Sequence, residues 1–483
     1  MTVNENAGRN MPDVRTLEKR ALSTITLMAV IGLLTVFVET MLVPALPTIS
    51  EELKASSSDL AWVLTGYTLA GAVTIPIVGK MGEMWGRKRV LLSIMLVYML
   101  GLAGAAVSWD LLSLIVFRAV QGIGMSAVPL LMGMAMDMLP PRMVPVGIGL
   151  ISAMIGVGAA TGLVAGGVLV ALLGWKECFW VVLPVVALPL IIVNRFIPDV
   201  QQRRPARMDA FGAGLLGIAV LSLLLALSQG EMWGWTSAPT IGLLAAAAVL
   251  FAAFVTQERR CQEPMIRLVL LRNRNISVAY INMFFIGMVM FMLYQTLPYF
   301  LGMPTEAGGF GISNQIVIGL FLLPNAAAQL VSSPLSGRLG QRIGHWQVLV
   351  IGLVITSAGL VGMALLSSSQ TAILITVMIF GTGIGMAGVG NTNLLSCVCS
   401  KEVFGTATSV NSMILTIGMS VGPVAASMIM GSVASGGSSY ANCWIMAALL
   451  ALMTVVFTLI NRARLTSGII GVELQEARLP EGD

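Results

Sequence analysis

Two ionisable side chains stand inside long apolar stretches of the sequence. Glu39 lies within the apolar run of residues 22–46, and Arg118 lies within that of residues 111–136. A charged group inside a bilayer is costly, by roughly 2.5–3.5 kcal/mol on insertion scales, so such residues are retained mainly where they have a function. A carboxyl group can bind and release a proton, whereas a guanidinium group stays positively charged. The pair therefore predicts proton chemistry within a membrane.

The positions of Glu39 and Arg118 predict that both side chains lie at one depth. Glu39 precedes the end of its segment at Leu46 by seven residues, and Arg118 follows Asp110, where its segment begins, by eight. At a helical rise of 1.5 Å per residue, both fall about 10–12 Å from the same boundary. Two interpretations remain open. Glu39 changes its charge and couples proton entry to substrate exit, or the two residues form a static ion pair that locks the helices.

The composition shows which class of protein must position these residues. Of the 483 residues, 57% are apolar and 10% are charged, whereas a soluble domain carries about 25% charged residues. So few charges cannot cover the surface of a soluble protein of this size. This excludes a soluble enzyme and a nucleic-acid binder, despite the net charge of +5. The chain is predicted to be an all-α polytopic membrane protein.

About fourteen segments are long and apolar enough to cross a bilayer. All of the 27 Lys and Arg residues except Lys54, Lys176 and Arg118 fall in the two tails and in alternate loops. Because positive charge accumulates on the cytoplasmic side, we expect a multi-pass protein of the plasma membrane with both termini in the cytoplasm. The expected spans are residues 22–46, 60–80, 90–107, 111–136, 145–173, 178–197, 210–229, 238–256, 276–301, 313–333, 347–367, 371–396, 405–433 and 441–461.

The two ends of the chain repeat each other at a spacing of 258 to 261 residues. Pro76, Gly79, Gly82 and Gly86 recur as Pro334, Gly337, Gly340 and Gly344, residues 122–125 recur as residues 383–386, and Gly158 and Gly162 recur as Gly418 and Gly422. Parallel repeats around a central site are typical of transporters. We therefore expect a cytoplasmic tail (1–21), an N-terminal six-helix bundle (22–197), a linker with two inserted transmembrane helices (198–275), a C-terminal six-helix bundle (276–461) and a cytoplasmic tail (462–483).

Several segments resemble the motifs of the major facilitator superfamily. Residues 79–89 resemble its loop signature, residues 114–124 its fourth-helix motif with an intramembrane Arg, and residues 149–167 the antiporter motif of its fifth helix. Residues 39–47 and 175–180 resemble motifs of the fourteen-helix drug:proton antiporter family. The resemblance implies the major facilitator fold, with two six-helix bundles and two inserted helices. It also implies proton-coupled efflux of lipophilic or cationic compounds by alternating access.

The sequence departs from the family pattern at several positions, and Glu39 and Glu83, which replace an Asp, keep the charge. Met84 replaces an Arg of the loop signature, and Leu163 replaces the Pro of the antiporter motif. Since proline would kink or soften the fifth helix, Leu163 weakens the inference of antiport over symport. Gln341 replaces the acid in the second copy of the loop, so the charge network at the cytoplasmic side is predicted to be asymmetric.

Polar, aromatic and Met side chains are candidates for the wall of a substrate cavity. Met and aromatic groups offer an adaptable surface to varied apolar ligands. Each of these residues can equally serve in packing or in an ordinary hydrogen bond between helices. The candidates are Met28, Thr35, Tyr67, Gln121, Met125, Tyr294, Gln295, Asn325, Gln329, Asn391 and Asn411.

Two further groups are predicted to serve the conformational change. At the cytoplasmic ends of helices two to four, Asp137 and Arg87 are expected to pair and separate as an inner gate, with a solvated loop as the alternative. The gate candidates are Gly79, Glu83, Gly86, Arg87, Arg89 and Asp137. Small residues let helices approach closely, and those of the antiporter motif predict a sliding contact between the halves or ordinary tight packing. They are Gly149, Gly158, Gly162, Gly166 and Gly167.

The sequence predicts neither a cofactor nor enzyme activity. The nucleotide-binding pattern G-x-x-x-x-G-K-[ST] is absent, so the energy must come from an ion gradient. The single histidine, His345, and the lone pair Cys397 and Cys399 do not make a metal site. The expected partners are a small-molecule substrate, protons and membrane lipids, without nucleic acid, and we expect a functional monomer. An exporter or symporter of a specific metabolite or lipid is the alternative. A membrane-embedded lipid enzyme would need clustered His, Asp or Ser, which the sequence lacks.

Overall fold

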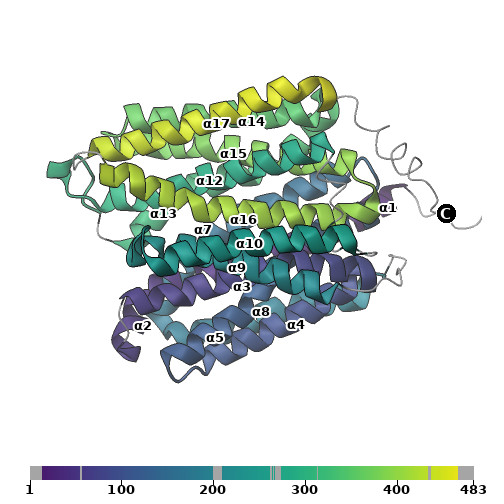
Figure 1. Cartoon of the computed structure of the whole chain (residues 1–483), viewed down its shortest axis with the longest axis horizontal. Helices are drawn as coiled ribbons and strands as arrows, with labels where there is room; N and C mark the ends of the chain where they lie inside the picture. The colour runs from purple at the N-terminus through teal and green to yellow at the C-terminus, as the bar shows by residue number, and fades with distance from the viewer. Residues whose placement is uncertain are drawn as a thin grey trace, which may run out of the picture.

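All the regular elements that the structure describes are helices. The structure, a computed structural model, describes residues 14–54, 57–199, 209–261, 264, 266, 273–312, 314–432 and 437–465. In these residues, 14 helical segments are long and apolar enough to cross a membrane, as the sequence predicts. The long helices run alongside one another in a single bundle (Figure 1).

The first half of the bundle comprises α1 to α8. The long first helix continues through a 3-10 turn into the short α2, and the other spans follow with short connections. The elements are α1 (Val14–Thr40), η2 (Val43–Ala45), α2 (Leu46–Leu53), α3 (Ser57–Trp85), α4 (Arg87–Ala106), α5 (Leu111–Gly122), η3 (Ile123–Ser126), α6 (Ala127–Met138), α7 (Val144–Leu173) and α8 (Trp175–Phe196).

The fourth span is interrupted near its middle, where the sequence analysis expected a continuous helix. α5 ends at Gly122, the 3-10 turn η3 follows, and α6 completes the span. The interruption lies where α5 and α3 touch, because a Cβ atom on Gly122 would lie only 2.2 Å from the carbonyl oxygen of Tyr67. A 3-10 stretch inside a helix often marks a functional or strained position.

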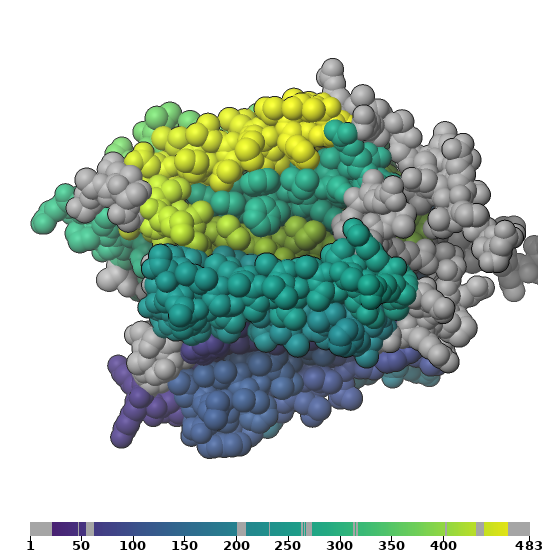
Figure 2. Space-filling model, viewed as in Figure 1, coloured from purple at the N-terminus to yellow at the C-terminus, as the bar shows by residue number. Residues whose placement is uncertain are grey.

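The second half comprises α12 to α17, and a helical hairpin precedes it. The hairpin consists of α9 (Ala210–Trp233) and α10 (Ala238–Arg260). α9 packs against both α3 and α16, so the hairpin bridges the two halves, and it crosses the middle of the face seen in Figure 2. The helices of the second half are α12 (Arg274–Gly302), α13 (Gln315–Ile343), α14 (His345–Leu365), α15 (Gln370–Val398), α16 (Lys401–Ser432) and α17 (Gly437–Leu465), with the turn η4 (Thr305–Ala307).

Two apolar clusters make up the core. One is confined to the second half. The other fills the first half and extends into α12, α15 and α16, where it includes Tyr280, Leu394 and Phe404. The two halves therefore share buried apolar surface.

The shared surface lies at one end of the bundle, which we call the basic end. It carries Arg87, Arg142, Arg195, Arg338 and Arg342, and the opposite end, with α2, is called the outer end. Three side chains at the basic end bond to the backbone of the other half. Thr406 N donates to Glu83 Oε1 over 2.7 Å, Gln341 donates to the Arg142 carbonyl, and Asn393 donates to the Pro145 carbonyl over 3.3 Å. These bonds close the basic end.

Candidate functional site

Arg118 ties α5 to two neighbouring helices through their backbones. Its side chain is completely buried. The guanidinium group donates to the carbonyl oxygens of Val63 on α3 and Val38 on α1, both over 3.4 Å, and to that of Glu39 over 3.3 Å. Hydrogen bonds to a charged donor are stronger than neutral ones. The positive charge is thus stabilised by carbonyl dipoles.

Two further side chains hold the guanidinium group in place. Gln121 accepts from it over 2.9 Å and donates to the Gly101 carbonyl on α4, also over 2.9 Å. The ring of Tyr67 lies against it, with 4.6 Å from Cζ to the ring centroid, a cation–π contact. Tyr67 in turn donates to the Thr35 carbonyl over 3.3 Å. Tyr67, Gln121 and Thr35, which were expected to line a cavity, are buried in this structure, and Tyr67 and Gln121 contact Arg118 directly.

The Glu39 carboxylate is not part of an ion pair in this arrangement. Glu39 is partly buried and precedes the last residue of α1. Within the described ranges, the ion pairs closer than 4.0 Å lie at the two ends of the bundle, and none includes Glu39. Arg118 contacts the backbone carbonyl of Glu39 instead of its carboxylate. The static ion pair is therefore not the arrangement of this structure, and the carboxylate can change its charge without breaking one.

The sequence analysis missed a buried tyrosine beside these residues. Tyr98 on α4 is completely buried, and it interacts electrostatically with both Arg118 and Glu39. Its ring packs on Gly124, where a Cβ atom would lie 2.4 Å from ring carbon Cδ2. The internal repeat could have drawn attention to Tyr98. An offset of 258 aligns it with Thr356, so the tyrosine occurs in the first half alone.

Three of the predicted polar residues of the second half meet in one cluster. Asn325 on α13 donates to the Tyr294 hydroxyl on α12 over 2.9 Å, and Gln329 donates to Asn325 Oδ1 over 3.2 Å. A Cβ atom on Gly156 of α7 would lie 2.8 Å from Gln329 Oε1, so the cluster reaches the first half. Tyr294 and its neighbour Gln295 are partly buried. Since Tyr294 accepts from Asn325, its own proton is available to another acceptor.

The two polar groups lie at similar depths. Tyr294 precedes the end of α12 at Gly302 by eight residues, which corresponds to about 12 Å from the outer end. This matches the depth expected for Glu39 and Arg118. Helices α1 and α12, which the repeat relates, thus carry polar side chains at one level.

The structure separates four other cavity candidates from this level. Asn391 donates to the Ala279 carbonyl over 3.0 Å and to Asn411 Oδ1 over 3.4 Å. Asn391 lies seven residues before the end of α15, about 10 Å from the basic end. The other two are Met28, which is completely buried in the core, and Met125, which packs beside Gly71.

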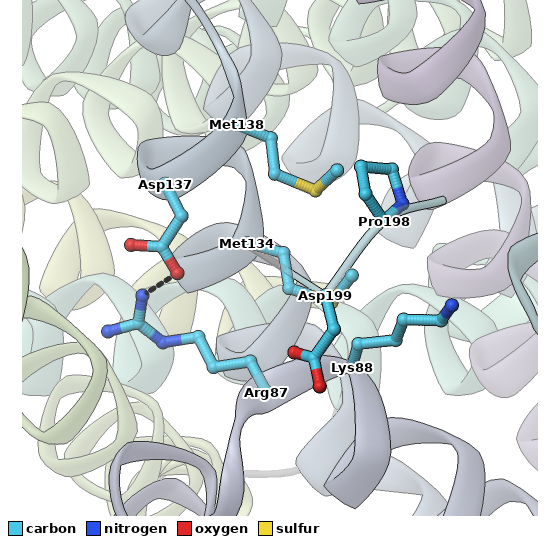
Figure 3. A pocket seen from close by; sticks show the side chains of 7 residues that line it. All are labelled: Arg87, Lys88, Met134, Asp137, Met138, Pro198 and Asp199. Atoms are coloured by element: carbon cyan, nitrogen blue, oxygen red, sulfur yellow. Dashed lines mark hydrogen bonds and ion pairs between the residues drawn. The ribbon is translucent and has the colours of Figure 1, made fainter. Parts of the chain in front are cut away.

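The predicted pair of Arg87 and Asp137 is present at the basic end. Arg87 Nη1 contacts Asp137 Oδ2 and also donates to the Gly133 carbonyl over 3.1 Å (Figure 3). The side chain of Arg87 is 2% exposed and that of Asp137 is 15% exposed. A Cβ atom on Gly133 would lie 2.6 Å from Arg87 Nε. The pair is therefore an enclosed contact between α4 and α6, unlike a solvated loop.

Arg89 takes part in a different contact. It pairs with Asp199 over 3.4 Å, within the first half. Lys88 donates to the Asn194 carbonyl over 3.0 Å and to the Ile197 carbonyl. Arg89, which was expected to belong to the gate, therefore links the start of α4 to the segment directly after α8. Figure 3 shows the small pocket between these contacts, which is lined by Arg87, Lys88, Met134, Asp137, Met138, Pro198 and Asp199.

Two of the remaining gate candidates, Gly79 and Glu83, lie where α3 meets α16. Glu83 accepts from Thr406 N, as described above. A Cβ atom on Gly79 would lie 2.6 Å from Ser409 Cβ, so glycine permits a close contact between the halves. Gly86 adopts φ +94°, which favours glycine, and begins the turn into α4.

The glycines of α7 face two different neighbours. Gly149 abuts the second half, since its Cβ would lie 2.6 Å from the Ser333 carbonyl oxygen. Gly158 and Gly162 instead face carbonyl oxygens of α1, and Gly166 faces that of Met41 directly after α1, at 2.5, 2.5 and 2.3 Å from the missing Cβ atoms. Gly167 is also buried. The expected contact between halves therefore applies to Gly149, whereas the other three pack α7 against the helix that carries Glu39.

The described residues contain no group of three or more His, Cys, Asp or Glu that could hold a metal ion. Together, the polar groups around Arg118 and around Tyr294 supply one carboxyl group, one guanidinium group, phenols and amides. Such a site can exchange a proton and offer hydrogen bonds to a ligand.

Comparisons with known proteins agree with this architecture. The family model described as Major Facilitator Superfamily matches residues 28–423 and 279–479. The chain is 30% identical over 425 residues to the tetracenomycin C resistance and export protein of Streptomyces glaucescens, covering 84% of this chain and 76% of the relative. It is 31% identical over 404 residues to the multidrug resistance protein Stp of Mycobacterium tuberculosis, covering 82% of this chain and 74% of the relative.

A solved structure supports the fold. The human organic anion transporter MFSD10 (TETRAN) superposes with a TM-score of 0.66 at 15% sequence identity, over 91% of this chain and 99% of that chain. At this identity the likeness concerns the fold alone.

Proposed function

The chain belongs to the major facilitator superfamily, and we propose that it is a proton-coupled exporter of lipophilic and cationic compounds. In this proposal, two six-helix bundles rock about a central site, so that the site opens to either side of the plasma membrane in turn. The basic end, with both termini, faces the cytoplasm.

The observation that carries the proposal is that, in the described part of the chain, the Glu39 carboxylate and the Arg118 guanidinium group do not form an ion pair. The positive charge of Arg118 is stabilised by hydrogen bonds to three carbonyl oxygens and Gln121, and the Glu39 carboxylate remains outside any ion pair of the described residues. A carboxylate held in a buried ion pair would be costly to protonate. Glu39 is instead free to alternate between a proton and a cationic substrate.

The relatives and the second polar cluster support the substrate class. The names of the relatives describe drug resistance and export. Tyr294 offers a hydrogen-bond donor at about the depth of Glu39, beside the aromatic ring of Phe291. The Glu39 carboxyl group in the first half and the Tyr294 phenol in the second half suit lipophilic compounds that carry a cationic group or a hydrogen-bond acceptor.

The closed basic end supports alternating access. The bonds of Glu83, Gln341 and Asn393 across the halves would all have to break for the site to open toward the cytoplasm. The enclosed pair of Arg87 and Asp137 lies beside them, because a Cβ atom on Gly405 would lie 2.9 Å from Arg87 Nη2.

The test is a substrate panel in proteoliposomes with an imposed pH gradient, with the wild type beside Glu39→Gln. We expect the wild type to transport several lipophilic cations when the gradient is present, and Glu39→Gln to bind them without gradient-driven transport. The exposed carboxylate of Glu306 provides a matched control, since Glu306→Gln should behave as the wild type. Gradient-driven transport by Glu39→Gln at the wild-type rate would refute the coupling. Transport of a single metabolite or lipid from the panel would favour the alternative, a dedicated exporter or symporter.

A further inference from the structure

The hydroxyl group of Tyr98 takes no part in the hydrogen bonds that are described around Arg118. Tyr98 is completely buried, and within the described ranges its Oη atom has no hydrogen-bond partner. Two other buried tyrosines, Tyr67 and Tyr280, donate to carbonyl oxygens over 3.3 and 3.2 Å. A buried polar group without a partner lowers the stability of the fold. An unpartnered hydroxyl beside a titratable site therefore needs a functional explanation.

The packing places Tyr98 one helical turn from the Gln121 contact that holds Arg118. On α4, Tyr98 and Gly101 are one turn apart and share a face. On the opposing segment, Gln121 and Gly124 are likewise three residues apart. Gln121, which holds Arg118, donates to the Gly101 carbonyl, and the Tyr98 ring packs over Gly124. The phenol is thus adjacent to the support of the guanidinium group.

The charged surroundings of Tyr98 are few and come from three helices. Arg118 on α5, Glu39 on α1 and Tyr67 on α3 interact with it electrostatically. Helices α6 and α8 also pack in this half, but their charged residues lie near the ends of the span. These residues are Asp137, Lys176, Glu177 and Arg195.

The internal repeat shows that the fold does not require a tyrosine here. The repeat aligns Tyr98 with Thr356 and Arg118 with Ile379. Thr356 is completely buried as well, but its hydroxyl bonds to the Gly352 carbonyl of its own helix over 2.9 Å. An equivalent helix thus packs with a small side chain whose hydrogen bond is made. The phenol occurs in the half that carries the acid and the guanidinium group.

We propose that Tyr98 is a positioning residue for proton coupling, whose O–H group donates a hydrogen bond to the Glu39 carboxylate once Glu39 has released its proton. The bond is direct or passes through a water molecule. Arg118 already directs its N–H groups at three carbonyl oxygens and Gln121, so it supplies charge to the site but few donors. Tyr98 supplies the donor. The inference rests on the proposed function, because it requires Glu39 to titrate.

The variant Tyr98→Phe tests this role, since it removes a single unpartnered oxygen and keeps the ring. A donor that contacts only the ionised carboxylate favours that form. Without it, proton release from Glu39 requires a higher pH. We expect the pH midpoint of transport in proteoliposomes to shift by about one unit toward alkaline pH, which corresponds to a tenfold change in the proton equilibrium. Substrate affinity and the melting temperature should stay at or above the wild-type values.

Two companion variants keep the outcomes distinct. Tyr280→Phe removes a hydroxyl that is bonded to the Ala407 carbonyl, so it should lower the melting temperature and leave the pH midpoint unchanged. A wild-type pH midpoint in Tyr98→Phe would overturn the role of Tyr98, as would a loss of substrate affinity together with transport. Glu39→Gln is measured alongside. If it retains gradient-driven transport, the proposed function itself fails; if it loses that transport while Tyr98→Phe matches the wild type, only the present inference fails.

Discussion

At the scale of single residues, the fixed and the variable charge belong to different side chains. Arg118 stays positively charged, and in the proposed function Glu39 gains and loses a proton. Arg118 is fixed by backbone carbonyls of two helices and by Gln121, so its position does not depend on the state of Glu39. A guanidinium group in a fixed place can then act on the carboxylate electrostatically. Such an arrangement lets one group titrate while its neighbours stay in position.

The pair at the basic end gives a prediction at this scale. Asp137→Asn replaces the carboxylate beside Arg87 by a neutral amide, and the pair is enclosed. Losing a charge-assisted hydrogen bond costs about 1.5–3 kcal/mol, which here weakens the closed basic end. Transport should therefore slow about tenfold while the substrate Kd stays nearly unchanged, as measured by uptake and equilibrium binding.

Asp199→Asn is the control for this prediction. Its partner Arg89 is 58% exposed, and exposed pairs are worth at most about 1 kcal/mol. Its transport rate should stay close to that of the wild type. Equal rates in Asp137→Asn and the wild type would show that the enclosed pair has no part in gating.

The residues that the sequence identified are those whose chemistry is unusual for their surroundings. Glu39 and Arg118 stand out because a bilayer tolerates few charges. Tyr98 does not, because a tyrosine on an apolar helix is unremarkable until its hydroxyl proves to lack a hydrogen-bond partner among the residues that the structure describes. The side on which Tyr67 and Gln121 lie depends on the rotation of α3 and α5, which their sequence alone does not specify. They therefore proved to be supports of Arg118 where a cavity wall was expected.

At the scale of elements, α5 is anchored at its outer end by a capping box. Asp110 accepts from Ser113 N over 2.8 Å, and the Ser113 hydroxyl accepts from Asp110 N over 3.2 Å. The box satisfies backbone groups that the first turn of a helix leaves free. It begins the helix that carries Arg118 two turns later.

The cap predicts a dependence of stability on pH. The hydrogen bonds from Ser113 lower the pKa of Asp110 below its ordinary value. A group whose pKa is lowered by folding stabilises the folded state above its unfolded pKa, and this contribution is lost as the pH falls through the lowered folded value. Asp110→Ala should therefore have a lower melting temperature at pH 7, and the difference should disappear in strongly acidic buffer. A difference that is independent of pH would show that the carboxylate charge contributes nothing.

The contact between α1 and α7 gives a second prediction for elements. A Cβ atom on Gly162 would lie 2.1 Å from Thr40 Oγ1 and 2.5 Å from the Phe37 carbonyl oxygen. Gly162→Ala must therefore push apart the helix that carries Glu39 and the helix that meets the second half. We expect a loss of about 1–3 kcal/mol in stability, as for overpacked cores, together with slower transport.

Gly214 on α9 provides the matched control. Among the described residues, no atom lies within 4 Å of the Cβ atom that Gly214→Ala would add, so its stability should change by less than about 0.5 kcal/mol. Thermal unfolding in detergent compares the two variants. If they unfold at the same temperature, the close packing of α1 on α7 does not limit stability.

The sequence predicts the number of membrane-spanning helices better than it predicts breaks within a helix or the neighbour that each helix contacts. Length and hydropathy set the 14 helices. The sequence did not predict the break at η3, which lies where Gly122 closely approaches the backbone of α3, a contact that exists only in the assembled bundle. For the same reason, the glycine pattern of α7 predicted close contacts but not which helix would make each one. The distribution of Gly149 and Gly162 between two partners is a property of the assembled bundle.

At the scale of the whole molecule, two contacts related by the repeat close the basic end. Glu83 on α3 bonds to the start of α16, and Gln341, at the equivalent place on α13, bonds to the segment before α7. The first uses a charged acceptor and the second a neutral donor. The sequence analysis predicted this asymmetry from the residue types, but it could not show that both side chains reach the opposite half.

The bond from Gln341 across the two halves predicts that a substitution there changes the balance between the closed and the open state of the basic end. Gln341→Glu removes the donor and places a carboxylate against the Arg142 carbonyl oxygen, so the closed state should lose about 1 kcal/mol, as for an ordinary hydrogen bond at an exposed position. Spin labels at the exposed positions Arg195 and Arg342 should then report a longer mean distance across the basic end. Gln341→Ala removes the bond without the repulsion and should give a smaller change. An unaltered distance distribution in both variants would exclude Gln341 from the closure.

The central claim is that Glu39 exchanges a proton for a substrate. Purified transporter in weakly buffered detergent tests it directly, because substrate binding to the protonated site must release protons to the solution. We predict that a cationic substrate acidifies the medium in the wild type and in Glu306→Gln, and that Glu39→Gln binds the substrate without acidification. Proton release from Glu39→Gln equal to that of the wild type would contradict the account.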